Sequence, residues 1–269
     1  MENSIQKSAI GVIDSGVGGL TVVKELMRIL PNEDIIYLGD SARCPYGPRS
    51  GKEVRQFTWQ MAEYLAKQGI KLLVVACNTA TAVALESLQK YCDFPVVGVI
   101  FPGARAAMKA TKKQSIAVLG TIGTVRSGAY EIAIKALSTS AEIVPFACPL
   151  FVPVVESNEY EGEFAEKIVH ESLKPLIGQA FDTVILGCTH YPLLQPLIEK
   201  ELGSNIQVVS SAEETAQNVK ELLAYYHLAN EMTNVAHYEF LTTGSVGMFT
   251  EIVQAWLPNV PAQVKQIHL

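Results

Sequence analysis

Short apolar runs rich in β-branched residues alternate along this chain with longer segments whose apolar residues recur every three to four positions. Runs of the first kind are typical of buried strands, and segments of the second kind are typical of amphipathic helices. The pattern predicts strands at 9–13, 34–38, 71–76, 96–100, 115–119, 142–147, 183–187, 206–209, 236–242 and 262–267. It predicts helices at 19–30, 51–68, 79–91, 102–111, 124–138, 160–179, 192–202, 211–228 and 245–256. Such alternation is typical of an α/β protein built on parallel sheets.

Two parts of the chain resemble each other, which indicates an internal duplication. Residues 10–18, IGVIDSGVG, are echoed by residues 116–124, IAVLGTIGT. A second matched pair follows at similar distances: ACNTA at 76–80 and GCTHY at 187–191, each after an apolar run. We therefore expect two α/β units, each with one cysteine where a strand ends. A pair of opposed thiols is what proton transfer on both sides of one carbon would need.

The composition fits two domains and disfavours several kinds of partner. A length of 269 residues, 49% of them hydrophobic, suffices for about two domains with cores of their own. The net charge of −6 and the scattered Lys and Arg residues argue against nucleic acid and an anionic membrane surface. No apolar stretch approaches the roughly 20 residues of a membrane span, and Asp14 interrupts the first apolar run too early for a signal peptide. Five cysteines without a C-x-x-C pair fit reduced thiols, so we expect a cytoplasmic protein.

Cys77 and Cys188 are the candidate reactive thiols. A single cysteine after a buried strand is more often an inert apolar side chain. These two recur in matched units, and each precedes a predicted helix whose N-terminus would lower the thiol pKa. The other cysteines, 44, 92 and 148, have no matched partner and are expected to be structural. His190 lies two residues after Cys188, where acid–base support is favoured over a metal site because the other histidines form no cluster.

Two loops are candidates for binding, and each has a plainer interpretation as a turn. Residues 14–19, DSGVGG, lie between a predicted strand and helix but lack the third glycine of a dinucleotide fingerprint. Asp14 or Ser15 would serve there as a helix cap or would bind an ammonium group. Residues 43–48, RCPYGP, form a proline-flanked loop in which Tyr46 and Gly47 would line a pocket or merely form a turn.

Taken together, these segments resemble glutamate racemase, a family of bacterial enzymes that make D-glutamate for peptidoglycan. The resemblance runs from about residue 8 to the C-terminus. It rests on segments 11–20 (GVIDSGVGGL), 44–47 (CPYG), 76–80 (ACNTA) and 186–193 (LGCTHYPL).

The resemblance implies a racemase that needs no cofactor and binds no metal, with two pseudo-symmetric parallel-sheet α/β domains and glutamate bound between them. It implies one domain formed by 1–98 with 208–269, which carries Asp14 and Cys77, and a second formed by 99–207, which carries Cys188. A homodimer is compatible with it. The implied catalytic residues are Cys77, Cys188, Asp14, His190 and Glu156. The implied substrate-binding residues are Asp14, Ser15, Tyr46, Gly47, Asn78, Thr79, Thr121, Thr124, Thr189 and His190, with Asp40 near the site.

Three alternatives stay open at this point. A racemase acting on aspartate or a hydantoin would share the fold and the thiols. A cysteine hydrolase or decarboxylase would use one thiol only, and an amino-acid-binding module would use neither for chemistry.

Overall fold

The computed structural model describes residues 5–231, 235–261 and 263–269. Its strands are β1 (Ile10–Asp14), β2 (Ile35–Gly39), β3 (Leu72–Val75), β4 (Val96–Gly98), β5 (Ser115–Gly120), β6 (Glu142–Ala147), β7 (Thr183–Gly187), β8 (Gln207–Ser210), β9 (Tyr238–Thr242) and β10 (Val264–Gln266). Its α-helices are α2 (Leu20–Ile29), α3 (Gly51–Lys67), α4 (Asn78–Tyr91), α5 (Ile100–Ala110), α6 (Ile122–Ser127), α7 (Ala129–Leu137), α8 (Phe151–Glu156), α9 (Gly162–Leu173), α10 (Gln195–Leu202), α11 (Ala212–Tyr225) and α12 (Val246–Trp256). Two 3₁₀ turns complete the set, η1 (Lys174–Leu176) and η2 (Tyr191–Leu194). Each predicted strand overlaps an observed one, although Ala262 of the last prediction lies outside the described residues.

The strands form two separate sheets in which every pairing is parallel. The first sheet has the order β10-β9-β2-β1-β3-β4 and the second the order β6-β5-β7-β8. The order β2-β1-β3-β4 matches β6-β5-β7-β8 strand for strand, and the first sheet adds β9 and β10 beside β2. This confirms the expected fold of two pseudo-symmetric α/β units.

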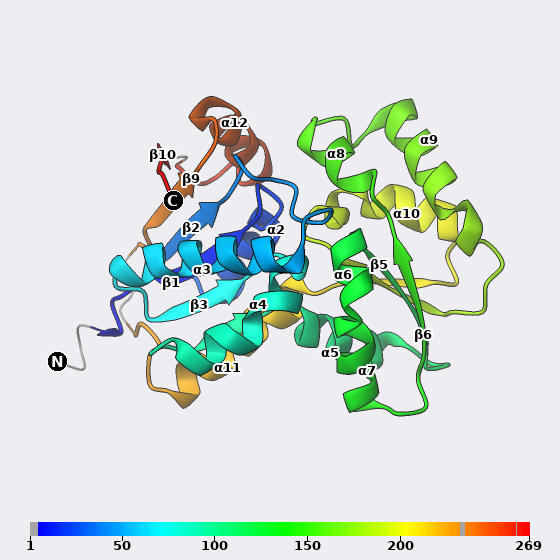
Figure 1. Ribbon diagram of the computed structural model, residues 1–269, viewed down its shortest axis with the longest axis horizontal. Helices are drawn as coiled ribbons and strands as arrows, with labels where there is room; N and C mark the ends of the chain where they lie inside the picture. Colours follow the sequence, from blue (N-terminus) through cyan, green and yellow to red (C-terminus); the bar gives the residue numbers. More distant parts are fainter. Residues whose placement is uncertain (1–4, 232–234, 262) are drawn as a thin grey trace.

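Each sheet is buried on both faces by helices, which explains its continuous apolar strands. We call the six-stranded sheet with its helices the first lobe and the four-stranded sheet with its helices the second lobe; they lie side by side in Figure 1. In the first lobe, α2, α11 and α12 pack on one face and α3 and α4 on the other. In the second, α8, α9 and α10 cover one face and α5 and α7 the other. Alternate residues of each strand belong to opposite cores, as Val74 and Val75 do in β3.

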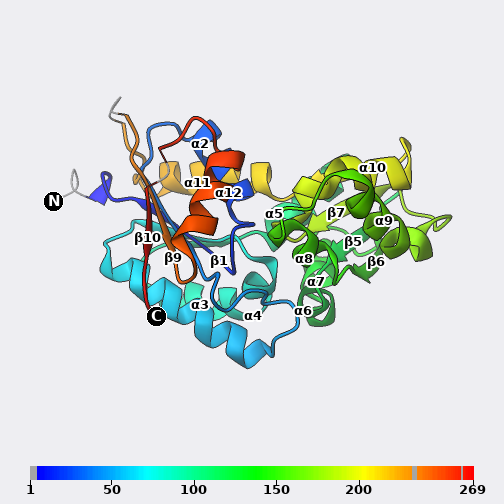
Figure 2. The ribbon, with the colours of Figure 1, turned by 90° about the horizontal axis from the view of Figure 1, so that it is seen from above.

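The chain passes between the lobes twice. It leaves the first lobe between Gly98 of β4 and Ile100 of α5, and it returns between Ser210 of β8 and Ala212 of α11. The segment after α11 then adds β9 next to β2, so the first and the last described strands, β1 and β10, lie in the same lobe (Figure 2). The domain ranges derived from the resemblance stay a proposal, and these two crossings are where the sheets divide the chain.

Several helices differ from the predicted ones for local reasons. The predicted helix at 124–138 is split because Gly128 adopts the left-handed conformation, with φ of +66°, between α6 and α7. Helix α8 was not predicted, since Pro149 and Pro153 interrupt its sequence pattern. Cys188 is followed by the short turn η2 before α10 begins, so it does not cap an α-helix as expected. Within the described part of the chain, every helix is too short or too polar to cross a membrane.

Candidate active site

The predicted site residues converge because they follow strands whose carboxyl ends face the boundary between the lobes. Asp14 ends β1 and Cys77 follows β3, while Thr121 follows β5 and Cys188 follows β7. A small enclosed space of about 10 Å³, room for about one water molecule, lies between them. It is lined by Ser15, Pro45, Tyr46, Gly47, Cys77, Asn78, Thr79, Thr121, Val152, Cys188, Thr189 and His190. Both candidate thiols therefore face one pocket, one from each lobe.

The Cys77 thiol lies in an environment that favours its protonated form. Its side chain is buried, and its Sγ donates to the hydroxyl of Ser15 at 3.7 Å. Burial raises the pKa of Cys77 to about 12, and the negative charge of Asp14 adds to the rise. The backbone N–H of Ala80 in α4 acts in the opposite direction but does not outweigh them. The expected lowering of this thiol's pKa by the helix N-terminus is therefore wrong for Cys77.

The Cys188 thiol faces a histidine that is held as a cation. Sγ of Cys188 lies 3.8 Å from Nδ1 of His190, whose Nε2 lies 2.5 Å from Oε1 of Glu156. Burial alone would lower the pKa of His190. The interactions with Cys188 and Glu156 outweigh that effect and raise it well above its ordinary value. Burial would raise the pKa of Glu156, but the contact with His190 keeps it below its usual range. The structure places His190 beside Cys188, and acid–base support of this thiol by the histidine stays a prediction.

Glycine residues in the loop after β1 allow the second lobe to approach. A Cβ atom on Gly18 would lie 2.4 Å from Nδ1 of His190, so a larger residue would displace the imidazole. The neighbouring Asp14 is fully buried and accepts hydrogen bonds from the N–H of Gly16 at 3.1 Å and the hydroxyl of Thr189 at 3.2 Å. Burial raises the pKa of Asp14, against the influence of His190. The sequence DSGVGG thus serves close packing between the lobes.

The loop from Asp40 to Gly47 is tied to two other parts of the molecule. The buried carboxylate of Asp40 accepts hydrogen bonds from Tyr46, from Nε of Arg43 at 2.6 Å and from the hydroxyl of Thr243, after β9, at 2.8 Å. At the far end, the carbonyl of Gly47 accepts a hydrogen bond from the N–H of residue 123, in α6 of the second lobe, at 2.9 Å. Asp40 therefore lies behind Tyr46 and anchors it, and it does not line the pocket.

Hydroxyl and amide groups meet across the pocket from the two lobes. The hydroxyl of Thr79 lies 2.9 Å from that of Thr121 and 3.2 Å from that of Thr124. Beside them, the phenol of Tyr130 in α7 donates to Oδ1 of Asn78 at 2.7 Å. These groups can bind carboxylate or ammonium groups of a small zwitterion.

The structure thus gathers every predicted site residue at the lobe boundary, with Asp14, Thr124 and Glu156 just behind the pocket lining. Sequence reasoning missed Tyr130 and Val152, which lie on elements without a matched motif. It treated Cys44 as structural and did not place it near the site, whereas its thiol lies 3.6 Å from Oε1 of Glu156. The segment 43–48, whose side chains the sequence already singled out, was the signal that could have placed Cys44 here.

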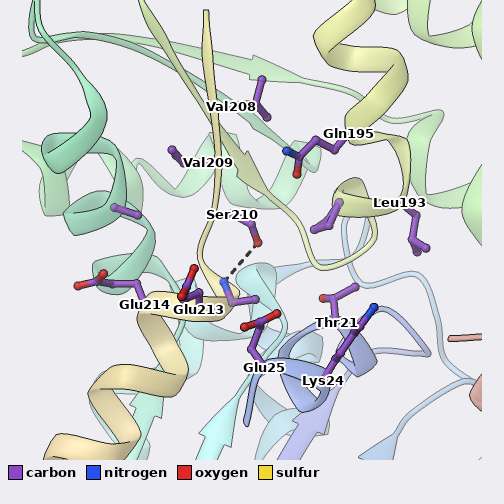
Figure 3. A pocket seen from close by; sticks show the side chains of 13 residues that line it. Thr21, Lys24, Glu25, Leu193, Gln195, Val208, Val209, Ser210, Glu213 and Glu214 are labelled. Carbon is purple, nitrogen blue, oxygen red and sulfur yellow. Dashed lines mark hydrogen bonds between the residues drawn. The ribbon is translucent and has the colours of Figure 1, made fainter. Parts of the chain in front are cut away.

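A larger hollow near the site contains neither thiol. It has a volume of about 540 Å³ and lies between α2, α10, β8 and the start of α11 (Figure 3). Figure 3 shows the charged side chains of Lys24, Glu25, Glu213 and Glu214 around it. Thr21 on its wall donates to the carbonyl of Thr189 at 3.1 Å, so the hollow backs onto the site. Among the described residues, no group of three or more His, Cys, Asp or Glu side chains is placed to hold a metal ion.

Comparison with known proteins shows that the chain is similar to racemases. The sequence model of the Asp/Glu/hydantoin racemase family matches residues 10–219. A glutamate racemase of Lysinibacillus sphaericus is 61% identical over 261 residues, which are 97% of this chain and 98% of that protein. One from Enterococcus faecalis is 54% identical over 265 residues, covering 98% and 97% of the two chains.

Solved structures give the same result. A glutamate racemase isoform from Bacillus anthracis superposes with a TM-score of 0.94 at 47% identity, over 98% of both chains. A glutamate racemase from Francisella tularensis in complex with D-glutamate gives 0.90 at 33% identity, again over 98% of both. The resemblance drawn from the sequence is confirmed. The two parallel-sheet lobes, the family model and the matched relatives show that the chain belongs to the Asp/Glu/hydantoin racemase family and is a racemase, a kind of isomerase.

Proposed function

We propose that this enzyme interconverts L- and D-glutamate by proton transfer between Cys77, Cys188 and the α-carbon, without a cofactor. The observation that carries the proposal is that two buried thiols from opposite lobes line one pocket. Glutamate as the substrate is supported by the names of the relatives and by the D-glutamate complex of the Francisella protein.

The surroundings of the thiols suit one as an acid and the other as a base. Cys188 as a thiolate, beside the His190 cation, removes the α-proton, and the C–H electron pair passes to the α-carbon and its carboxylate. Cys77, whose raised pKa keeps its proton, delivers that proton to the opposite face. The turnover leaves Cys188 as the thiol and Cys77 as the thiolate, which is the starting state for the reverse direction. General acid–base catalysis of this kind depends on both groups being positioned at once.

Substrate binding needs a larger pocket than the structure contains. A space of about 10 Å³ is far smaller than a glutamate molecule. Two polar contacts between the lobes, Thr79 with Thr121 and Thr189 with Asp14, therefore have to lengthen when glutamate binds. The same groups become free to bind its carboxylates and ammonium, as the resemblance implies.

The cellular role follows from the product. D-glutamate made in the cytoplasm would supply peptidoglycan synthesis, which is the role that the resemblance implies. A homodimer is compatible with the proposal.

Incubation of the enzyme with L-glutamate in D₂O tests the proposal. We expect D-glutamate to form with deuterium at the α-carbon, and chelator or hydroxylamine treatment to leave the rate unchanged. A loss that added metal or pyridoxal phosphate restores would contradict the cofactor-free mechanism.

Other products would identify the alternatives. Release of CO₂ or ammonia would indicate a one-thiol decarboxylase or hydrolase, and binding without deuterium exchange would indicate a binding module. An equal or higher kcat/KM with aspartate or a hydantoin would show that the enzyme is a racemase for that substrate instead of glutamate. Aspartate is one methylene shorter than glutamate, and a difference of one methylene changes transition-state binding by about 1–3 kcal/mol.

A further inference from the structure

Asn78, which directly follows Cys77, has one half of its amide group occupied and the other half unpartnered. Its side chain is 2% exposed and lines the pocket. Oδ1 accepts the hydrogen bond from Tyr130 at 2.7 Å, whereas Nδ2 is buried with no hydrogen-bond partner in the described structure. A buried amide N–H without a partner is unfavourable and uncommon in folded proteins. Its place on the pocket wall points to an acceptor on the bound molecule.

Tyr130 decides which half of the amide is occupied. Its phenol is 3% exposed, and Oδ1 of Asn78 is its one hydrogen-bond partner among the described residues. If the amide were turned over, Nδ2 would face the phenol oxygen and the phenol proton would lose its acceptor. The hydroxyl therefore selects the orientation in which Nδ2 is left for the pocket.

Two glycines leave the space that the Tyr130 ring occupies. A Cβ atom on Gly103 of α5 would lie 2.9 Å from the phenol oxygen. A Cβ atom on Gly187, which immediately precedes Cys188, would lie 3.0 Å from the ring. The ring thus packs against the end of β7, directly before Cys188, while its hydroxyl reaches the residue beside Cys77. It connects the two halves of the site directly.

We propose that Tyr130 is a positioning residue that orients Asn78 so that Nδ2 donates a hydrogen bond to a carboxylate oxygen of the substrate. This inference rests on the proposed function for the identity of that substrate. Because Tyr130 and Asn78 belong to different lobes, the amide is held in this orientation only while the lobes are together. Closure of the lobes and capture of the carboxylate are therefore coupled through one hydrogen bond.

A double-mutant cycle tests this inference, with Tyr130→Phe, Asn78→Ala and the double variant. Calorimetric titration with racemic glutamate gives Kd without net turnover, and kcat and KM are measured in both directions. We expect each single substitution to raise Kd by about 5- to 10-fold, the effect of one hydrogen bond. Tyr130→Phe should change kcat by no more than about twofold. The double variant should bind no more weakly than Asn78→Ala, because Tyr130 acts through Asn78.

The control variant is Thr215→Val, which removes a buried hydrogen bond, 2.7 Å long, from the Thr215 hydroxyl to the carbonyl of Ser211 at the start of α11. It should leave Kd unchanged, and thermal unfolding of all variants reports on folding. A Kd unchanged by Tyr130→Phe, or single effects that multiply in the double variant, would overturn the inference. If the wild type binds glutamate but does not interconvert its enantiomers, the proposed function fails while the cycle on Kd still decides the role of Tyr130. If it does not bind glutamate, both fail.

Discussion

Cys77 and Cys188 occupy equivalent places in two lobes of the same strand order, yet their electrostatic surroundings are opposite. Cys77 follows β3 and faces Ser15 and the carboxylate of Asp14. Cys188 follows β7 and faces the imidazole of His190, which pairs with Glu156. The backbone is therefore repeated while the charges around the thiols are not. A duplicated fold can place two identical groups symmetrically and still surround them with different charges.

This asymmetry bears on the order of proton transfers. The raised pKa of Cys77 favours its thiol form and the raised pKa of His190 favours a cation beside Cys188, which suits transfer from the substrate to Cys188 and from Cys77 to the substrate. For the opposite direction the protons have to be redistributed before turnover. The predictions below test how far the two thiols are equivalent.

The largest effect is expected from removal of either thiol. Cys77→Ser and Cys188→Ser should each lower racemisation in both directions by about 10³-fold or more, because each turnover uses both groups and a hydroxyl is a poor base near neutral pH. Each variant should still exchange the α-hydrogen of the enantiomer that faces its intact thiol. Rates of racemisation and of deuterium exchange are the measurements. A Cys188→Ser enzyme with near wild-type racemisation would refute the two-thiol mechanism.

Two other cysteines provide the control for these thiol variants. Cys148 is buried in the core of the second lobe and Cys92 lies partly exposed at the end of α4. Replacement of either by serine should affect mainly stability, by about 1–3 kcal/mol where the thiol is buried.

The second prediction separates the two sides of the pocket. His190→Asn removes the cation beside Cys188, so exchange on the enantiomer that Cys188 deprotonates should fall by about 10²-fold. That enantiomer is the one whose exchange survives in Cys77→Ser. Exchange on the other enantiomer should fall much less. Equal losses on both would show that His190 acts on the pocket as a whole.

The third prediction compares two carboxylates by their effect on stability. Asp14 is fully buried, and its raised pKa means that the folded state disfavours its charge. Asp14→Asn should therefore stabilise the protein at neutral pH, by about 1 kcal/mol, while lowering activity. Glu156 has a lowered pKa through His190, so Glu156→Gln should destabilise by a similar amount. Urea unfolding measures both, and shifts of the same sign would contradict the assignment.

The fourth prediction, with the smallest expected effect, concerns how the contribution of the pair His190–Glu156 to the free energy of unfolding depends on pH. Because the pKa of His190 is raised, this residue contributes to the stability of the folded state. The contribution is complete below about pH 6.5 and is lost as the pH rises through the pKa of His190 in the folded state. Because the pKa of Glu156 is lowered, this residue also contributes to stability. Its contribution is present above about pH 4.5 and is lost as the solution becomes more acidic. The difference in unfolding free energy between wild type and Glu156→Gln should therefore be greatest between about pH 4.5 and 6.5. A difference that grows with alkaline pH would contradict the pairing.

The sequence predicted the strands and both thiols because these follow local patterns. Apolar runs ended by polar or glycine residues mark β1, β3, β5 and β7, and parallel strands bring their carboxyl ends together. What it could not predict depends on contacts between distant segments. The burial that keeps Cys77 protonated, the approach of Cys44 to Glu156, and the bond from Tyr130 to Asn78 all require the packed lobes. Helix α8 carries Glu156 but its prolines hid it from a periodicity argument.

The strands of the first sheet are synthesised in an order that differs from their order in the sheet. Strands β1 to β4 emerge first, but the neighbour of β2 in the finished sheet is β9, which is synthesised after the whole second lobe. Until then β2 has an open edge that could pair with another nascent chain. Asp40 also lacks its bond from Thr243 until then, so the loop that carries Tyr46 is not yet fully anchored. The part of the site that is translated first therefore gains its last anchoring contact only after β9 has been made.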